Sequence, residues 1–144
     1  MINVRNNSTK DIHKFDTLRG ADLRSMDLRG NNLSRQDLAG ANLAGADLTE
    51  VNLFGACLDG ANLHQATLTR ARLDGASLRG ANLDWASLRS AFLRKADISG
   101  ASVDATIFFC ANLEGAILAG VDLTHANIDG AILPFVTETE KDHD

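Results

Sequence analysis

Residues 75–88 read GASLRGANLDWASL, in which leucine recurs at every fifth position. The register holds without a slip from Leu18 to Leu133, so an apolar residue forms the centre of 24 consecutive pentads between Asp16 and Phe135. Alanine stands two positions before the centre in 17 of these pentads, and all 12 glycines stand two positions after a centre. The fold therefore has to bury one large and one mostly small side chain in every five residues.

The five-residue period excludes both regular secondary structures as continuous elements. In an α-helix, residues five apart are rotated by about 140° relative to one another, so the leucines would spread around the whole circumference. In a straight β-strand, the odd spacing would place successive leucines on opposite faces. A chain that extends for about three residues, turns and then repeats keeps every leucine on the inner side.

The remaining positions of the pentad fit such a coil. Glycine tolerates the positive φ or the crowded corner that a tight turn requires, which predicts a turn two residues after each centre. The position just before the centre is Asp, Asn, Ser or Thr in 18 of the 24 pentads. Short polar side chains of this kind bond to nearby backbone groups, so we expect the polar ladder to be structural.

The segments GADLRS, GANLAGADL and GANLHQATL resemble the tandem repeats of pentapeptide-repeat proteins. The resemblance rests on 24 in-frame copies and covers about five sixths of the chain. It implies an all-β fold, a right-handed quadrilateral parallel β-helix (solenoid) with one pentad on each side and four in each coil. The predicted six coils would span roughly 29 Å at about 4.8 Å between stacked strands.

The chain divides into three predicted segments. Residues 16–135 form the β-helix, residues 1–15 an N-terminal cap and residues 136–144 a polar, acidic C-terminal tail. Two apolar groups are expected to cover the open coils against edge pairing. They are Ile2, Val4, Ile12 and Phe15 at one end, and Pro134, Phe135 and Val136 at the other.

Composition and charge limit the classes of function. No run approaches the roughly 18 to 20 apolar residues of a membrane-spanning helix, and the N-terminal residues are too charged for a signal-peptide core. Cys57 and Cys110 are too few for a disulfide framework and are not clustered as in a zinc site, which favours the reducing cytoplasm. The net charge of −5 combines +3 over residues 1–35, −1 over residues 36–100 and −7 over residues 101–144.

The folding scheme brings no catalytic or metal-binding constellation together. His64 and His125 share a side but lie three coils, or about 14 Å, apart, which is too far for one metal ion. Cys57 and Cys110 fall on different sides two coils apart, so neither a disulfide nor a Cys/His nucleophile pair is expected. The glycines lack the Gly-Lys-Ser/Thr ending of a phosphate loop. We therefore expect no enzyme activity, no cofactor and no metal.

Outward-facing apolar residues are the more informative departures from the pattern. Phe92 replaces the usual short polar residue, and Ile107 and Phe109 flank Phe108 where the repeat is weakest. Aromatic groups rimmed by arginine are typical of protein-binding surfaces, although degeneration of the repeat with local packing would leave the same trace. The candidate protein-binding patch comprises Phe92, Ile107, Phe109, Arg72, Arg89, Arg94 and Lys95. Phe54 and Trp85 stand more isolated.

A second candidate surface is a basic collar around the first coil. It consists of Arg19, Arg24, Arg29 and Arg35, which point outward from four successive sides. The collar could meet an acidic partner, the acidic end of another copy or simply water. Without interleaved aromatic residues it does not favour nucleic acid.

Two functions remain in view. The first is a non-catalytic scaffold or protein-interaction module whose partner the sequence does not name; the coil ends or the exposed phenylalanines could also join two copies in a homodimer. The alternative comes from the resemblance, because some pentapeptide-repeat proteins imitate DNA and protect DNA gyrase from quinolones or toxins. Those proteins are acidic rods, some with protruding loops or a hydrophobic C-terminal helix. This chain has a first half that is not acidic and pentads without a loop.

Overall fold

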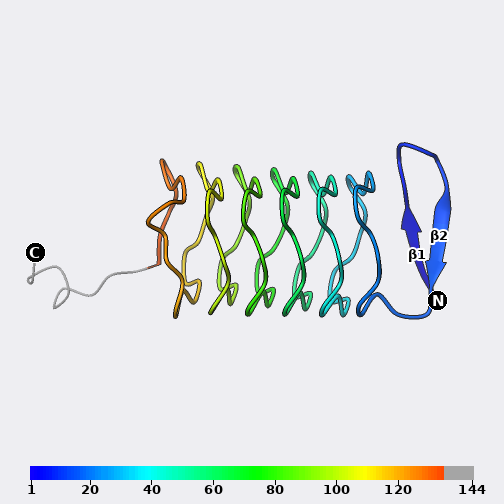
Figure 1. Ribbon diagram of the computed structural model, residues 1–144, viewed down its shortest axis with the longest axis horizontal. Coiled ribbons are helices and arrows are strands. Elements are labelled where there is room, and N and C mark those ends of the chain that lie inside the picture. Colours follow the sequence, from blue (N-terminus) through cyan, green and yellow to red (C-terminus); the bar gives the residue numbers. More distant parts are fainter. Residues whose placement is uncertain (135–144) are drawn as a thin grey trace, which may run out of the picture.

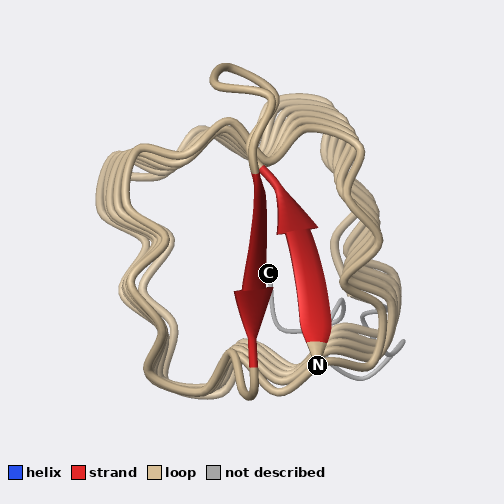
Figure 2. Ribbon diagram, turned by 90° about the vertical axis from the view of Figure 1, so that its right-hand side faces the viewer, coloured by secondary structure: helices blue, strands red, loops and turns tan. Residues whose placement is uncertain are grey.

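The computed structural model describes residues 1–134 as a straight rod with a β-hairpin at its N-terminal end (Figure 1). Successive coils lie side by side along the rod, and the view down the axis shows a four-sided outline (Figure 2). The tail predicted over residues 136–144, together with Phe135 and Val136 of the predicted C-terminal cap, lies outside the described residues.

Parallel pairing at an interval of 20 residues stacks the coils. Asn42 bridges Asn62, and Asn62 in turn bridges Asn82 one coil further along. Around each bridge the backbone bonds in both directions: the Leu43 amide donates to the Asn62 carbonyl at 2.7 Å, and the Asn62 amide donates to the Ala41 carbonyl at 2.9 Å. The predicted right-handed quadrilateral β-helix, with four pentads in each coil, is confirmed.

Each side of a coil makes a single bridge before the chain turns. In the described part of the chain, continuous strands therefore occur only in the N-terminal hairpin, as β1 (Ile2–Arg5) and β2 (Ile12–Phe15). The turn after each centre is closed by a hydrogen bond, such as that from the Ala61 amide to the Leu58 carbonyl at 3.0 Å. The residue two after the centre has a positive φ, as in a type II turn.

Several of these positive-φ positions are not glycine. Ala105 has a φ of 56°, and Trp85 has a φ of 63°. A left-handed conformation costs an L-residue roughly 1–2 kcal/mol because Cβ crowds the following carbonyl oxygen. The stacked hydrogen bonds impose this conformation at non-glycine positions, so the turns follow the coil and not only the local residue.

We expect the Ala105→Gly variant to be more stable than wild type by about 0.5–1 kcal/mol, because relief at positive φ exceeds the added entropy of the unfolded chain. Ala39→Gly is the matched control, since Ala39 is half-buried and occupies the preceding turn position without a positive φ. That control should lose about 0.4–1 kcal/mol. Urea unfolding of both variants measures the difference, and a loss of stability in Ala105→Gly would contradict the steric explanation.

The core is a column of centres with alanines between them. Every centre from Leu18 to Leu113 is buried, and the alanines two positions earlier in the middle coils face the same interior. Phe108 is fully buried in place of leucine, and Thr106 is buried because its Oγ1 donates to the Leu83 carbonyl at 2.7 Å. In the last coil the centres are only partly covered, and Leu133 is 40% exposed.

The hairpin β1–β2 lies across the N-terminal mouth of the coil (Figure 2). Val4 is fully buried, while Ile2 and Phe15 pack against the core from the edge. Asn31 fastens the hairpin by accepting from the Arg5 amide at 3.0 Å and donating to the Arg5 carbonyl at 2.9 Å. Ile12 departs from the prediction that it covers the coil: it pairs with Arg5, which faces outward, and it is 52% exposed.

The polar ladder has the predicted structural role. Every Asp or Asn directly before a described centre accepts a hydrogen bond from the backbone amide two residues later. Where the coil has serine there, an aspartate of the preceding coil replaces this acceptor. Asp84 accepts both from the Ser102 hydroxyl at 2.6 Å and from the Asp104 amide at 2.8 Å.

This replacement can be tested by rescue. Asp84→Ala should lower the free energy of unfolding by about 1 kcal/mol, because it leaves the Asp104 amide and the Ser102 hydroxyl without their acceptor. Adding Ser102→Asn should restore most of the loss, since asparagine there can accept from the Asp104 amide as Asn82 accepts from Asp84. Thermal and urea unfolding of the single and double variants measure this. A double variant no more stable than Asp84→Ala would contradict the replacement.

Candidate protein-binding face

One side of the rod gathers most of the candidate residues. We call it side 4; its centres recur every 20 residues from Leu33 to Leu133. The bridges Arg72↔Phe92 and Phe92↔Asn112 place these three residues in one outward-facing column. Arg94 and Lys95 follow on the same side, in the turn that ends it. The structure thus brings together the residues of the candidate patch that belong to this side.

The other members of the patch lie on the preceding side, around one corner. Ile107 is half-buried and bridges Ser87 and Asn127, and Phe109 stands in the turn that leads to side 4. The guanidinium carbon of Arg89, from the coil below, lies 5.1 Å from the centre of the Phe109 ring. Phe92 and Phe109 remain 44% and 38% exposed. The two rings therefore flank the same edge of the rod.

The sequence analysis missed Phe54, which also belongs to side 4. Phe54 is 41% exposed, and the guanidinium carbon of Arg35 lies 5.6 Å from its ring centre. A shallow hollow of about 410 Å³ lies next to this ring, lined by Phe54, Asp74, Gly75, Arg94 and Lys95. The hollow exists because Gly75 leaves open space between the coils of Phe54 and Lys95. Sorting the residues by the period of 20 would have found Phe54.

We call this combined surface the aromatic-arginine face. It comprises Arg35, Phe54, Arg72, Phe92, Arg94 and Lys95 on side 4, and Arg89, Ile107 and Phe109 around the corner. Arg94 is paired with Glu114 at 3.4 Å. No carboxylate of residues 1–134 lies within 4 Å of Arg72, Arg89 or Lys95. The face therefore combines exposed aromatic rings with cations that have no acidic partner in the described chain.

The basic collar differs in this respect. Arg24 makes two bonds of 2.8 Å to Asp22, Arg29 makes bonds of 2.8 and 2.7 Å to Asp27, and Arg19 bonds Asp37 at 2.9 Å. Arg35 is the one collar arginine without such an ion pair among residues 1–134, and it belongs to the aromatic-arginine face. The collar thus offers much less free charge than its sequence indicates.

The ion pairs of the collar shift the acidity of their carboxyl groups. The hydrogen bonds from Arg29 hold the pKa of Asp27 at about 2, below its ordinary value of 3.8. The bond from Arg24 likewise lowers the pKa of Asp22. The pKa of Asp37 is lowered first by the Ala39 amide and then by Arg19. All three carboxyl groups therefore stabilise the fold in their charged form.

This predicts a loss of stability in acid. Because the pKa of Asp27 is depressed, its contribution is present above about pH 4 and disappears as the pH falls towards 2. Asp27→Asn keeps an oxygen that can accept from the Arg29 amide but removes the charge, so its melting temperature should fall less steeply between pH 4 and 2 than that of wild type. Asp129→Asn, at a carboxylate with no ion pair in the described chain, is the control. Equal slopes for wild type and Asp27→Asn would contradict the assignment.

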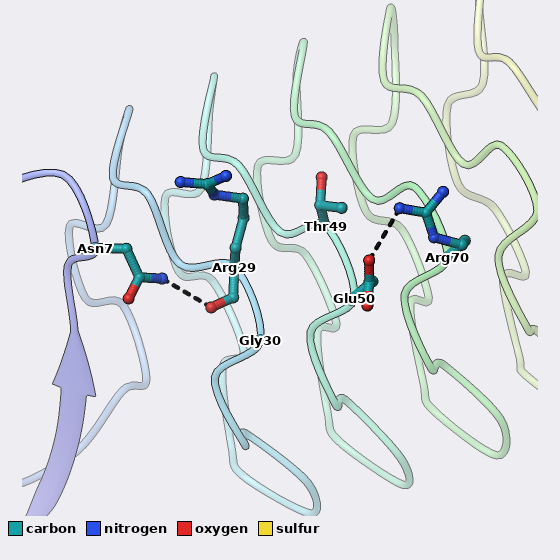
Figure 3. Close-up of a pocket in the computed structure, with 6 residues that line it drawn as sticks. All are labelled: Asn7, Arg29, Gly30, Thr49, Glu50 and Arg70. Carbon is teal, nitrogen blue, oxygen red and sulfur yellow. Dashed lines mark hydrogen bonds and ion pairs between the residues drawn. The ribbon is translucent and has the colours of Figure 1, made fainter.

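A second hollow lies between the hairpin and the collar (Figure 3). Asn7 donates to the Arg29 carbonyl at 2.8 Å, and Arg70 pairs with Glu50 at 2.9 Å. Since Arg29 is also paired with Asp27, both guanidinium groups that line the hollow already bind a carboxylate. Their charges serve the fold and leave little for an anionic ligand.

Groups with catalytic or metal-binding chemistry stay dispersed. Cys57 and Cys110 are both free thiols, and residues 1–134 contain no group of three or more His, Cys, Asp or Glu side chains that could hold a metal ion. His125 lines a hollow with Asp84, Asp104 and Asp122, but Asp84 and Asp122 already accept hydrogen bonds from backbone amides. Within the described range, no helix is long and apolar enough to cross a membrane.

Comparisons with known proteins agree with the coil geometry. The family model described as pentapeptide repeats, in 8 copies, matches residues 17–55, 47–84, 56–94, 66–108 and 106–136. No curated protein sequence matches the chain.

Three solved structures are similar to it. The crystal structure of a pentapeptide repeat protein, Rfr23, from the cyanobacterium Cyanothece 51142 is 23% identical with a TM-score of 0.71, covering 79% of this chain and 88% of its own. A pentapeptide repeat protein from the Arabidopsis thaliana thylakoid lumen is 26% identical with a TM-score of 0.56, covering 84% and 75%. HetL from Nostoc sp. strain PCC 7120, a protein involved in heterocyst differentiation regulation, is 33% identical with a TM-score of 0.33, covering 83% and 75%.

Proposed function

The chain belongs to the pentapeptide-repeat family, and we propose that it is a non-catalytic scaffold that binds another protein through its aromatic-arginine face. The observation that carries this proposal is the placement of Phe54, Phe92 and Phe109 among Arg72, Arg89 and Lys95, which have no carboxylate partner in the described chain. Partly exposed aromatic residues and arginines are the residue types that dominate the energetics of protein interfaces.

The stacked coils make the face a rigid platform. Its side chains are held on bridges and turns that repeat every 20 residues, so little backbone entropy would be lost on binding. The aromatic rings supply apolar area, while the cations select a partner of opposite charge. A cytoplasmic location, expected from the sequence, stays a prediction.

The proposal is tested by affinity capture with a matched pair of variants. Phe92→Ser/Phe109→Ser removes two rings of the face, whereas Trp85→Ser removes an exposed aromatic residue on another side as the control. Proteins captured from the native extract by wild type and by Trp85→Ser should be lost with the double variant, as measured by quantitative mass spectrometry. Equal capture by all three proteins would overturn the proposal.

The alternative function, imitation of DNA towards gyrase, has less support from the surface charge. A DNA mimic needs a continuous acidic surface, whereas side 4 carries Arg35, Arg72, Arg94 and Lys95 against Asp74 and Glu114. A supercoiling assay with gyrase and a quinolone separates the two functions. Protection of gyrase at stoichiometric amounts of protein would favour the mimic over the proposed scaffold.

A further inference from the structure

The described chain ends on the ridge of the aromatic-arginine face. Ile132 bridges Asn112 on side 4, and Pro134 then takes the position that Arg94 occupies two coils earlier and Phe54 four coils earlier. At about 4.8 Å for each coil, Pro134 lies roughly 10 Å from Arg94 and 19 Å from Phe54 along the axis. The chain beyond Pro134 therefore starts at one end of this face.

The residues that follow have the opposite charge. Residues 135–144 carry Glu138, Glu140, Asp142 and Asp144 against a single lysine, Lys141. The face carries Arg35, Arg72, Arg89, Arg94 and Lys95 against Asp74 and Glu114. The net charges of the segment and of the face are thus equal in size and opposite in sign.

The spacing of these charges also suits the face. The four carboxylates stand at every second position, so in any extended segment they project from one edge, about 6.8 Å apart. Ten residues reach at most about 33–36 Å, which exceeds the distance from Pro134 to Phe54. Phe135 and Val136 precede the charges and match the apolar part of the face, which includes Phe92.

We propose that residues 135–144 of the same chain bind the aromatic-arginine face and are its first ligand. The inference rests on the proposed function in so far as it takes this face to be a binding surface. Because the segment is tethered, its effective concentration at the face is in the millimolar range, so weak contacts suffice for occupancy. An external protein must then carry an acidic, apolar segment that displaces it.

Nuclear magnetic resonance on the full-length protein tests this without any partner. The variant Glu138→Gln/Glu140→Gln/Asp142→Asn/Asp144→Asn removes the charges of the segment and changes little else. At low ionic strength, the backbone amide signals of Phe54, Asp74, Arg94 and Lys95 should differ between this variant and wild type. The difference should vanish near 0.5 M NaCl, because surface charges are then screened within a few ångströms.

Two controls make the outcome decisive. Thr137→Ser/Thr139→Ser, which keeps every charge, should leave the signals of the face as in wild type, and the amides of Asn62 and Asn82 on another side should be unchanged throughout. Shifts confined to residues next to Pro134, or shifts that depend on protein concentration, would overturn binding within one chain. The capture experiment with the phenylalanine variants is independent of this result, so failure of one proposal is distinguishable from failure of the other.

Discussion

Replacing Leu63 by alanine is expected to lower the free energy of unfolding by about 2–5 kcal/mol, as for other fully buried leucines. Leu63 is fully buried in a middle coil, and the alanines above and below it are too small to fill the space that its side chain would leave. The coils on either side are fixed by backbone hydrogen bonds, so they cannot collapse onto the cavity.

Leu133→Ala is the matched control for this prediction. It changes the same residue type at the same pentad position, but Leu133 is 40% exposed in the last coil. Its loss should be at most about 1 kcal/mol, since much less apolar area leaves water on folding. Urea denaturation followed by circular dichroism measures both values. Similar losses for the two variants would mean that the coils do not pack as a continuous core.

The second large effect is expected from Val4→Asp, which should release the N-terminal hairpin from the coil. Val4 is fully buried, and a carboxylate there would have no hydrogen-bonding partner to offset its lost hydration. Once the hairpin detaches, the first coil presents unpaired backbone groups and apolar centres such as Leu18 to water. Open strand edges of this kind pair with other chains. We therefore expect self-association as well as a lower melting temperature.

Asn3→Asp provides the control, because Asn3 is the neighbouring residue on β1 and is exposed. It introduces the same charge without burying it. Light scattering and limited proteolysis within residues 1–15 should distinguish Val4→Asp from both wild type and the control. A monomeric Val4→Asp protein with a protected hairpin would show that the hairpin is not the cap.

Much of the fold is predictable because a five-residue period has few physical solutions. The inward leucines and alanines, the turn after each centre and the role of the Asp and Asn ladder all follow from that period. The hairpin pairing does not, since residues 1–15 lie outside the repeat and Ile12 resembles its buried neighbours in type. Its exposure depends on which residue it opposes across the hairpin, here Arg5.

The candidate face was predictable in its columns but not in its charge. Period 20 assigns every residue to a side, and on that basis Phe54 could have been joined to Phe92. The pattern does not say whether an arginine turns back to a carboxylate two residues earlier, as Arg24 does to Asp22, or reaches into the next coil, as Arg19 does to Asp37. Such choices depend on side-chain rotamers, and they decide which cations remain free.

The interval of 20 residues between bridged positions separates the requirements of folding from those of recognition. Inserting or deleting one pentad would leave the stacked hydrogen bonds and the core intact, but it would rotate everything beyond that point by a quarter turn about the axis. An insertion between Phe54 and Phe92 would move the two rings onto different sides. Length changes in this rod are therefore neutral for the coil in steps of five, but neutral for the azimuth of its surface residues only in steps of twenty.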